Sequence, residues 1–166
     1  MELAELFARH HGELYRYAER FTGDADLAED VVQDAFVRLA LRPPPDHSHL
    51  RAWLFRVTTT VALDALRGAR RRRSLAEANA ARLPAAEPPA DPAVEVERAE
   101  LRGRVRSALD ELAPRDRAML LMWQEGFTHR EIAEAVATTE KSVGTMLARA
   151  LAKLARRLDL DGEDKP

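Results

Sequence analysis

The chain has 166 residues, of which 46% are hydrophobic and 33% are charged, and its formal net charge is −2, which is typical of a soluble, helix-rich protein with one domain or two small ones. No apolar run reaches the roughly 18 residues of a membrane span, and the N-terminus lacks a secretory signal, so we expect a cytoplasmic protein without membrane insertion. The absence of cysteine excludes disulfides and thiolate metal sites, and the five histidines show no metal-ligand spacing, so we expect no bound metal and no cofactor.

Two helices are predicted at the start of the chain. Apolar residues recur at three- and four-residue steps from Leu3 to Phe21, and Gly23 follows as a helix-ending residue. Asp24 can cap a second helix, which has a buried side of similar spacing up to Leu39. Three consecutive prolines from Pro43 then end it, because proline cannot continue a helix.

The second helix is predicted to carry an acidic face. Acids in its first turn are favoured by the helix dipole and need no partner, but Asp30, Gln33 and Asp34 lie further along. Asp30 and Asp34 are four residues apart and share a face, and we expect that face to have no partner within the segment. Such a face is usually just solvated. The alternative is a docking surface for a basic partner.

The stretch from Leu50 to Arg73 predicts a third helix with an arginine-rich surface. Its seven arginines stand against one aspartate, so they cannot all be neutralised within the stretch. A polyanion is the expected partner, because each cation set against a phosphate releases condensed counterions. Trp53 and Phe55 could stack on unpaired bases, although helical spacing favours the core for Trp53. The alternative for the terminal arginines is a solvated helix end.

The composition changes after residue 73. Residues 74–91 are rich in alanine and proline without a sustained apolar stripe, which predicts a linker. Helical spacing returns from Val94 to Leu112, and a further helix is predicted between Pro114 and Gly126. No alternation long enough for a sheet occurs, so we expect two small all-helical domains.

The stretch from Phe127 to Arg149 predicts two helices joined by a tight turn. Thr128 and Glu131 suit a capping box that starts the first helix at His129. The second helix follows Thr139, which can cap it, so the pair is a helix-turn-helix candidate. The alternative is an ordinary helical hairpin. In a helix-turn-helix, a set of polar residues would point outward and could meet base edges and phosphates in a major groove. This outward set is Thr139, Glu140, Lys141, Ser142, Thr145 and Arg149.

Three motifs in this order resemble the bacterial sigma-70 family, specifically the short extracytoplasmic-function (ECF) group of RNA polymerase sigma factors. They are DADLAEDVVQDAFVRL, LRAWLFRVTTTVALDALRGARRRR and LDELAPRDRAMLLMWQEGFTHREIAEAVATTEKSVGTMLARALAKL. The resemblance covers nearly the whole chain. It implies a region 2-like domain at 1–73, a linker at 74–91, and a region 4-like domain with an acidic tail at 92–166.

The resemblance implies a role for each motif. The first motif would bind the clamp helices of the largest subunit of core RNA polymerase, through Asp30, Val31, Gln33, Asp34, Phe36, Val37 and Arg38. The second would recognise and melt the −10 element and hold its opened single strand, through Trp53, Arg56, Thr60, Asp64, Arg67, Arg70 and Arg71. The outward set of the third would read the double-stranded −35 element. The resemblance also allows for an anti-sigma protein as a further partner.

The chain departs from the family pattern at several positions. Thr60 stands where the family often has asparagine, and Ala137 stands where the turn commonly has glycine. Gly144 and Met146 stand where the recognition helix often has basic or polar residues. The −35 sequence therefore cannot be predicted from the residues.

We expect an all-α protein of two small helical domains joined by a flexible Pro/Ala-rich linker. Its expected function is that of a sigma factor, which acts only with core polymerase and catalyses nothing itself. The main alternative is a free-standing helix-turn-helix regulator whose N-terminal helices dimerise or sense a signal, but a sensor needs no polyanion-binding face. An enzyme is the least favoured class, because the sequence has no P-loop, no dinucleotide-binding glycine motif and no HExxH.

Overall fold

The computed structural model describes residues 2–77 and 94–160, and within these two ranges it contains helices and no strand. The elements are α1 (Leu3–Thr22), α2 (Ala25–Leu41), η1 (His47–His49), α3 (Leu50–Glu77), α4 (Val94–Asp110), α5 (Pro114–Gln124), α6 (His129–Val136) and α7 (Glu140–Leu160). The prediction of an all-α fold is confirmed. The acidic tail beyond residue 160 and most of the predicted linker lie outside the described residues.

Local signals set the ends of the first two helices, as predicted. Gly23 adopts a left-handed conformation with φ 72°, and its N–H donates to the Glu19 carbonyl at the end of α1. The Asp24 side chain then accepts from the Leu27 N–H at 2.9 Å, so α2 starts one residue later. α2 ends at Leu41, two residues before the first of the three prolines.

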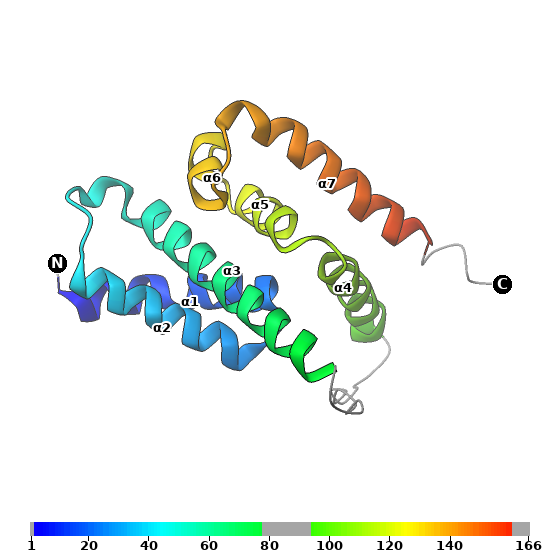
Figure 1. Cartoon of the computed structure of the whole chain (residues 1–166), viewed down its shortest axis with the longest axis horizontal. Helices are drawn as coiled ribbons and strands as arrows, with labels where there is room; N and C mark the ends of the chain where they lie inside the picture. The colour runs from blue at the N-terminus through cyan, green and yellow to red at the C-terminus, as the bar shows by residue number, and fades with distance from the viewer. Residues whose placement is uncertain (1, 78–93, 161–166) are drawn as a thin grey trace.

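Helix α3 runs through the middle of the molecule. It packs on α1 and α2 on one side and on α5 and α6 on the other (Figure 1). Because both sides are covered, Leu54, Phe55, Thr58 and Thr59 are all fully buried, although they span more than one helical stripe. The helix continues to Glu77, past the residue at which we predicted the linker to begin.

The N-terminal half (residues 2–77) and the C-terminal half (residues 94–160) share one hydrophobic core. The Phe55 ring lies at its centre, 5.0 Å from the Tyr17 ring and 4.7 Å from the Phe127 ring between centroids. Both ring pairs are tilted, at interplanar angles of 53° and 51°, and aromatic pairs in such geometries add stabilisation beyond the burial of their area. The division into two domains remains a prediction, but the halves lie in direct contact.

Tyr17 anchors α1 to α3 inside this core. Thr59 Oγ1 donates to the Phe55 carbonyl at 2.7 Å, so the Tyr17 hydroxyl is the donor in its own 2.6 Å bond to Thr59 Oγ1. Complete burial raises the pKa of Tyr17 well above its usual range, and the hydrogen bond between Tyr17 and Thr59 only partly opposes this. Tyr17 therefore stays neutral and acts as a structural donor.

The C-terminal half is built around α5, a short helix that begins with Pro114 at its first turn. Five consecutive residues from Ala118 to Met122 are buried, because α5 is enclosed by α1, α3, α4, α6 and α7. The long helix α7 lies on the outer side of this half, against α4, α5 and α6 (Figure 1).

Candidate nucleic-acid and polymerase-binding surfaces

The predicted helix-turn-helix is present as α6 and α7. Both bonds of the capping box form: Thr128 Oγ1 accepts from the Glu131 N–H at 3.3 Å, and Glu131 Oε2 accepts from the Thr128 N–H at 2.8 Å. Phe127 and Ile132 on either side of the cap are buried, as expected for a hydrophobic staple. These local contacts fix the angle at which the chain enters α6.

The turn between α6 and α7 is strained at one residue. Ala137 has φ 54°, in the left-handed region that a side chain disfavours. Arg115 on α5 donates to the Ala137 carbonyl at 2.9 Å, which holds the strained residue against the rest of the half. Buried Val143, Leu147 and Ala150 hold α7 to the core.

The outward set of α7 faces solvent as predicted. Thr139, Glu140, Lys141, Thr145 and Arg149 are exposed, and Ser142 is half-buried. The hydroxyls of Thr139 and Ser142 lie 2.7 Å apart and form a hydrogen bond at the start of the helix. Neither Lys141 nor Arg149 forms an ion pair with any residue in the described ranges. This surface therefore offers uncompensated positive charge to a ligand.

Gly144 lies among these outward residues. A Cβ added to it would meet only the Cε1 atom of His129, at 3.6 Å, which is an ordinary van der Waals distance. Glycine in a helix costs about 0.5–1 kcal/mol relative to alanine. Packing within the described residues therefore does not require this glycine.

The candidate −10 residues lie along α3. Thr60, Asp64, Arg67, Arg70 and Arg71 are exposed, whereas Trp53 and Arg56 are half-buried. Trp53 packs against the core and lines a groove of about 440 Å³, which its neighbours Arg56 and Glu134 also line. The proposal that Phe55 stacks on bases is wrong, because its ring is fully buried between Tyr17 and Phe127.

Several polar groups of α3 are already engaged within the protein. Arg56 Nη1 lies 3.3 Å from Glu134 Oε2 on α6, and Arg67 Nη1 lies 3.4 Å from Asp64 Oδ1. The Thr60 hydroxyl donates to the Arg56 carbonyl at 2.9 Å. In contrast, Arg70 and Arg71 form no ion pair with the described residues.

The candidate polymerase-binding residues lie on α2, and the structure corrects two points about them. Asp30, Gln33, Val37 and Arg38 are exposed, with Val37 at 53%, and Asp34 is half-exposed. Val31 and Phe36 are buried, so they cannot contact a partner and instead hold α2 in place. The acidic face also has a partner within the helix, because Arg38 lies 3.0 Å from Asp34 at the favourable four-residue spacing. Asp30 keeps its charge uncompensated within the described ranges.

Glu29, another acid near this face, is tied to neighbouring side chains. Gln33 donates to Glu29 Oε1 at 3.1 Å, and His11 on α1 lies 3.3 Å from the same carboxylate. The bond from Gln33 is the main reason that the pKa of Glu29 lies below its usual range. Gln33 is therefore partly committed to its own helix.

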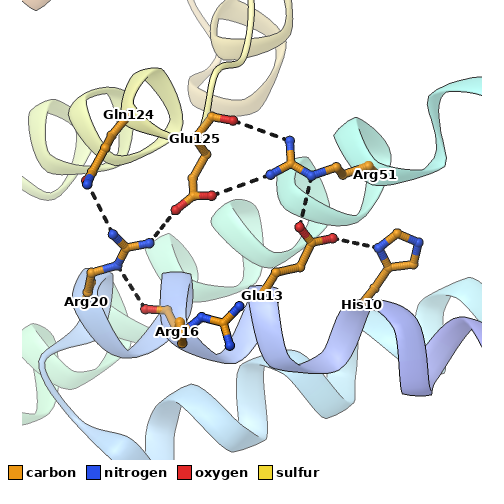
Figure 2. Close-up of polar contacts among 7 residues, drawn as sticks. All are labelled: His10, Glu13, Arg16, Arg20, Arg51, Gln124 and Glu125. Carbon is orange, nitrogen blue, oxygen red and sulfur yellow. Dashed lines mark hydrogen bonds and ion pairs between the residues drawn. The ribbon is translucent and has the colours of Figure 1, made fainter.

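Two residues that sequence reasoning missed join the halves. Arg117 on α5 is 6% exposed and donates to the Phe21 carbonyl at 2.7 Å and to Asp110 Oδ1 at 3.1 Å. Glu125 at the end of α5 accepts from Arg20 on α1 and from Arg51 on α3 (Figure 2). The spacing held one signal for Arg117, because it precedes buried Leu120 and Leu121 by three and four residues. No comparable signal marks Glu125.

Residues 2–77 and 94–160 contain neither a cluster of metal ligands nor a membrane-spanning helix. No group of three or more metal-ligating side chains lies together there. No helix in the described part of the chain combines the length and the apolar character that crossing a bilayer requires.

Two family models match the chain, one in each half. The model for "Sigma-70 region 2" matches residues 6–72, which span α1 to most of α3. The model for "Sigma-70, region 4" matches residues 102–154, which include the helix-turn-helix. The two matches therefore fall on the halves that carry the candidate −10 and −35 surfaces.

Curated relatives are similar over most of the chain. The ECF RNA polymerase sigma factor SigL of Mycobacterium tuberculosis is 32% identical over 153 residues, which cover 90% of this chain and 84% of that protein. The ECF RNA polymerase sigma factor SigG of the same species is 33% identical over 172 residues, covering 86% of this chain but only 45% of that protein. The chain thus spans about half the length of some of the relatives it matches.

Solved structures have the same fold. The sigma factor RpoE from Bartonella quintana, in complex with the anti-sigma factor NepR, gives a TM-score of 0.72 at 19% identity, covering 95% of this chain and 97% of that one. CnrH, in complex with the cytosolic domain of CnrY, gives a TM-score of 0.65 at 28% identity, covering 96% and 88%.

Proposed function

Because the chain belongs to the ECF group of sigma-70 factors, we propose that it binds core RNA polymerase and directs it to specific promoters. The proposal involves no catalytic step by this chain. It acts by positioning polymerase on DNA and by holding bases unpaired, and it works in the cytoplasm, where polymerase and promoters are.

The polymerase contact is assigned to the exposed side of α2. Asp30 offers an uncompensated carboxylate there, and Val37, seven residues or about two turns further along the helix, offers an exposed apolar group. A charged rim around apolar contacts is the usual make-up of a protein interface. We expect the clamp helices of the largest polymerase subunit to supply the complementary basic surface.

The promoter contacts are divided between the halves. The outward set of α7 would enter the major groove of the −35 duplex, with Lys141 or Thr145 at base edges and Arg149 at a phosphate. Thr60, Asp64, Arg67, Arg70 and Arg71 on α3 would meet the opened −10 strand. One solved structure with the same fold is a complex with an anti-sigma factor, so we expect such a protein as a third partner.

The observation that carries this proposal is the order of the two family matches along one chain. A region 4 match alone would suit many helix-turn-helix regulators. A region 2 match over the half with an acidic helix and an arginine-rich helix adds two surfaces that such a regulator does not need.

A pull-down of core polymerase by the full chain tests the proposal. Reversing both acids, Asp30→Lys with Asp34→Lys, should abolish or strongly weaken retention, because electrostatic complementarity with a basic surface is lost. Folding should persist, because exposed substitutions usually change stability by less than about 0.5 kcal/mol. Circular dichroism checks the helical content.

The matched control reverses two exposed acids in the other half, Glu100→Lys with Glu111→Lys. It has the same change in net charge and should retain polymerase normally. Equal loss in both double variants would mean that net charge, and not the α2 face, governs binding. If the wild-type chain retains no polymerase yet regulates a promoter as a dimer, the free-standing regulator is the correct function.

A further inference from the structure

The turn between α6 and α7 depends on one left-handed residue. The Ala133 carbonyl at the end of α6 accepts from the N–H groups of both Ala137 and Thr138, an arrangement that requires a left-handed backbone at Ala137. The other two residues with positive φ in the described ranges are glycines, Gly23 and Gly126. Glycine adopts this conformation freely, whereas the Cβ of alanine disfavours it. A bond from outside the turn would therefore stabilise the turn at Ala137.

Arg115 on α5 supplies such a bond. Its Nη2 donates to the Ala137 carbonyl at 2.9 Å, and its side chain makes no other hydrogen bond or ion pair with the described residues. A hydrogen bond from a charged donor is stronger than one between neutral groups. The helix that carries Arg115 is also firmly held, because the five residues from Ala118 to Met122 are buried. The bond therefore ties the turn to a fixed helix.

The turn is in turn joined to the start of α7. Thr138 Oγ1 donates to Met146 Sδ at 3.7 Å, and the hydroxyls of Thr139 and Ser142 lie 2.7 Å apart. A change of the backbone angles at Ala137 would therefore shift the first turns of α7 as well.

Two residues of the outward set, Lys141 and Thr145, lie in these first two turns of α7. Buried Leu147 and Ala150 hold the later turns to the core, so a shift would be concentrated at the start of the helix. Hydrogen bonds to base edges weaken steeply when their distance and angle depart from the optimum. Contacts to the phosphates position the protein but carry no sequence information directly. A small shift of α7 would therefore reduce sequence discrimination more than overall affinity for DNA.

We propose that Arg115 is a positioning residue for promoter recognition, because its bond to the Ala137 carbonyl holds the turn in the conformation that orients Lys141 and Thr145 toward base edges. Arg115 acts through the turn and does not itself read the sequence. This inference rests on the proposed function, in which α7 enters the −35 duplex. The competing role for Arg115 is a direct phosphate contact, since its side chain is exposed.

Sequence discrimination by the full chain bound to core polymerase tests the proposal. The probes are a duplex that the wild-type complex selects from a random pool and the same duplex with its upstream element scrambled. Arg115→Ala should lower the ratio of the two affinities roughly tenfold, the size of effect expected when a base contact is lost. The ratio does not depend on the fraction of folded protein, because the same folded molecules bind both duplexes. A loss of stability alone would therefore leave it unchanged.

A second substitution, Ala137→Gly, separates the two roles of Arg115. Glycine adopts the left-handed conformation without support, so Arg115→Ala combined with Ala137→Gly should restore the ratio to within about twofold of the wild-type value. Ala137→Gly alone should leave the ratio unchanged. Arg115→Met keeps the aliphatic stem but removes the donor, so it should behave like Arg115→Ala and replaces it if the alanine variant fails to fold.

Arg104→Ala is the matched control. Arg104 Nη2 also donates to a backbone carbonyl at 2.9 Å, that of Leu158 near the end of α7, and Leu158 is not left-handed. The substitution removes the same charge and the same kind of bond from the same half. It should keep the wild-type ratio.

The proposal is overturned if Arg115→Ala and Arg115→Met keep the wild-type ratio, or if Arg104→Ala lowers it equally. It is also overturned if Ala137→Gly does not restore the ratio, and a salt slope lower by about 0.9 would then identify Arg115 as a phosphate contact.

Denaturant unfolding of the free chain separates this inference from the proposed function. If the wild-type complex discriminates between no duplexes, the proposed function fails, but unfolding still decides whether the bond supports the turn. Arg115→Ala should lower the denaturant midpoint in the wild-type background and change it much less in the Ala137→Gly background, where the turn needs no support. Equal shifts in both backgrounds would show that the bond does not hold Ala137 in place.

Discussion

Helices α3 and α7 are the two candidate DNA-binding helices, and they differ in what their polar side chains already contact. On α7, Lys141 and Arg149 are exposed and have no ion pair within the described ranges. On α3, Arg51 and Arg56 are bound to carboxylates of the C-terminal half. Lys141 and Arg149 on the candidate duplex-binding surface are therefore unpaired within the described ranges, whereas Arg56 on the candidate strand-binding surface is already paired with Glu134.

The difference follows from where each helix lies. α7 is on the outer side of the molecule and buries one stripe, so its opposite side stays free. α3 is covered on two sides, and only its C-terminal part extends beyond the contact with α6 (Figure 1). Arg70 and Arg71 lie on that part and remain exposed. The free end of α3 should thus bind a strand before the covered end does.

Neutralising this free end should have the largest effect. Arg70→Ala with Arg71→Ala removes two phosphate contacts, which should reduce the salt slope for single-stranded DNA by about 1.4 and the affinity at 0.1 M salt by roughly 25-fold. A salt titration of binding to a single-stranded −10 oligonucleotide measures both. Arg9→Ala with Arg42→Ala, two exposed arginines elsewhere in the N-terminal half, should leave both unchanged. An unchanged slope in the first variant would identify the arginine run as a solvated helix end.

A single substitution on α7 should have a smaller effect. Arg149→Ala, if it removes one phosphate contact, should weaken all duplexes similarly, by roughly eightfold at 0.1 M salt, and lower the salt slope by about 0.9. Loss of Lys141 or Thr145 should instead cost about 1–3 kcal/mol on the preferred sequence only. Duplex binding by all three variants at the wild-type level would exclude α7 from the groove.

The features that could be predicted from the sequence are those that depend on residues close together in the chain. The capping box at Thr128, the end of α1 at Gly23 and the outward set of α7 depend on residues within a few positions of each other, and all three formed. The ion pair of Asp34 with Arg38 was equally local, but it was overlooked because only the acids of α2 were considered.

The features that could not be predicted from the sequence depend on contacts between segments that are distant in the chain. Phe55 was predicted to be available for bases because one helical stripe was expected to be buried, but α3 has neighbours on two sides. The roles of Arg117 and Glu125 arise from groups 74 to 105 residues away in the chain. Nothing in the spacing of one half indicates how it packs on the other.

Substitution of Gly144 on α7 should affect the stability of the helix and the binding of DNA in opposite directions. Gly144→Ala should raise the free energy of unfolding by about 0.5–1 kcal/mol, because an added Cβ meets only His129 at an ordinary distance. Denaturant unfolding measures this. If the glycine serves close approach to DNA, the same variant should bind duplex more weakly despite its greater stability. Unchanged stability would mean that the helix adjusts around the new methyl group.

The central claim is that this chain makes core polymerase select and open promoters through both halves. The most direct measurement is permanganate reactivity of unpaired thymines on promoter fragments, with core polymerase and with or without the chain. We predict that thymines at the −10 position become reactive only when the chain is present, on fragments that share two sequence elements. The double variant Arg70→Ala with Arg71→Ala should give fewer reactive thymines than the wild-type chain. If the chain retains polymerase but the number of reactive thymines does not increase, the proposed function is contradicted.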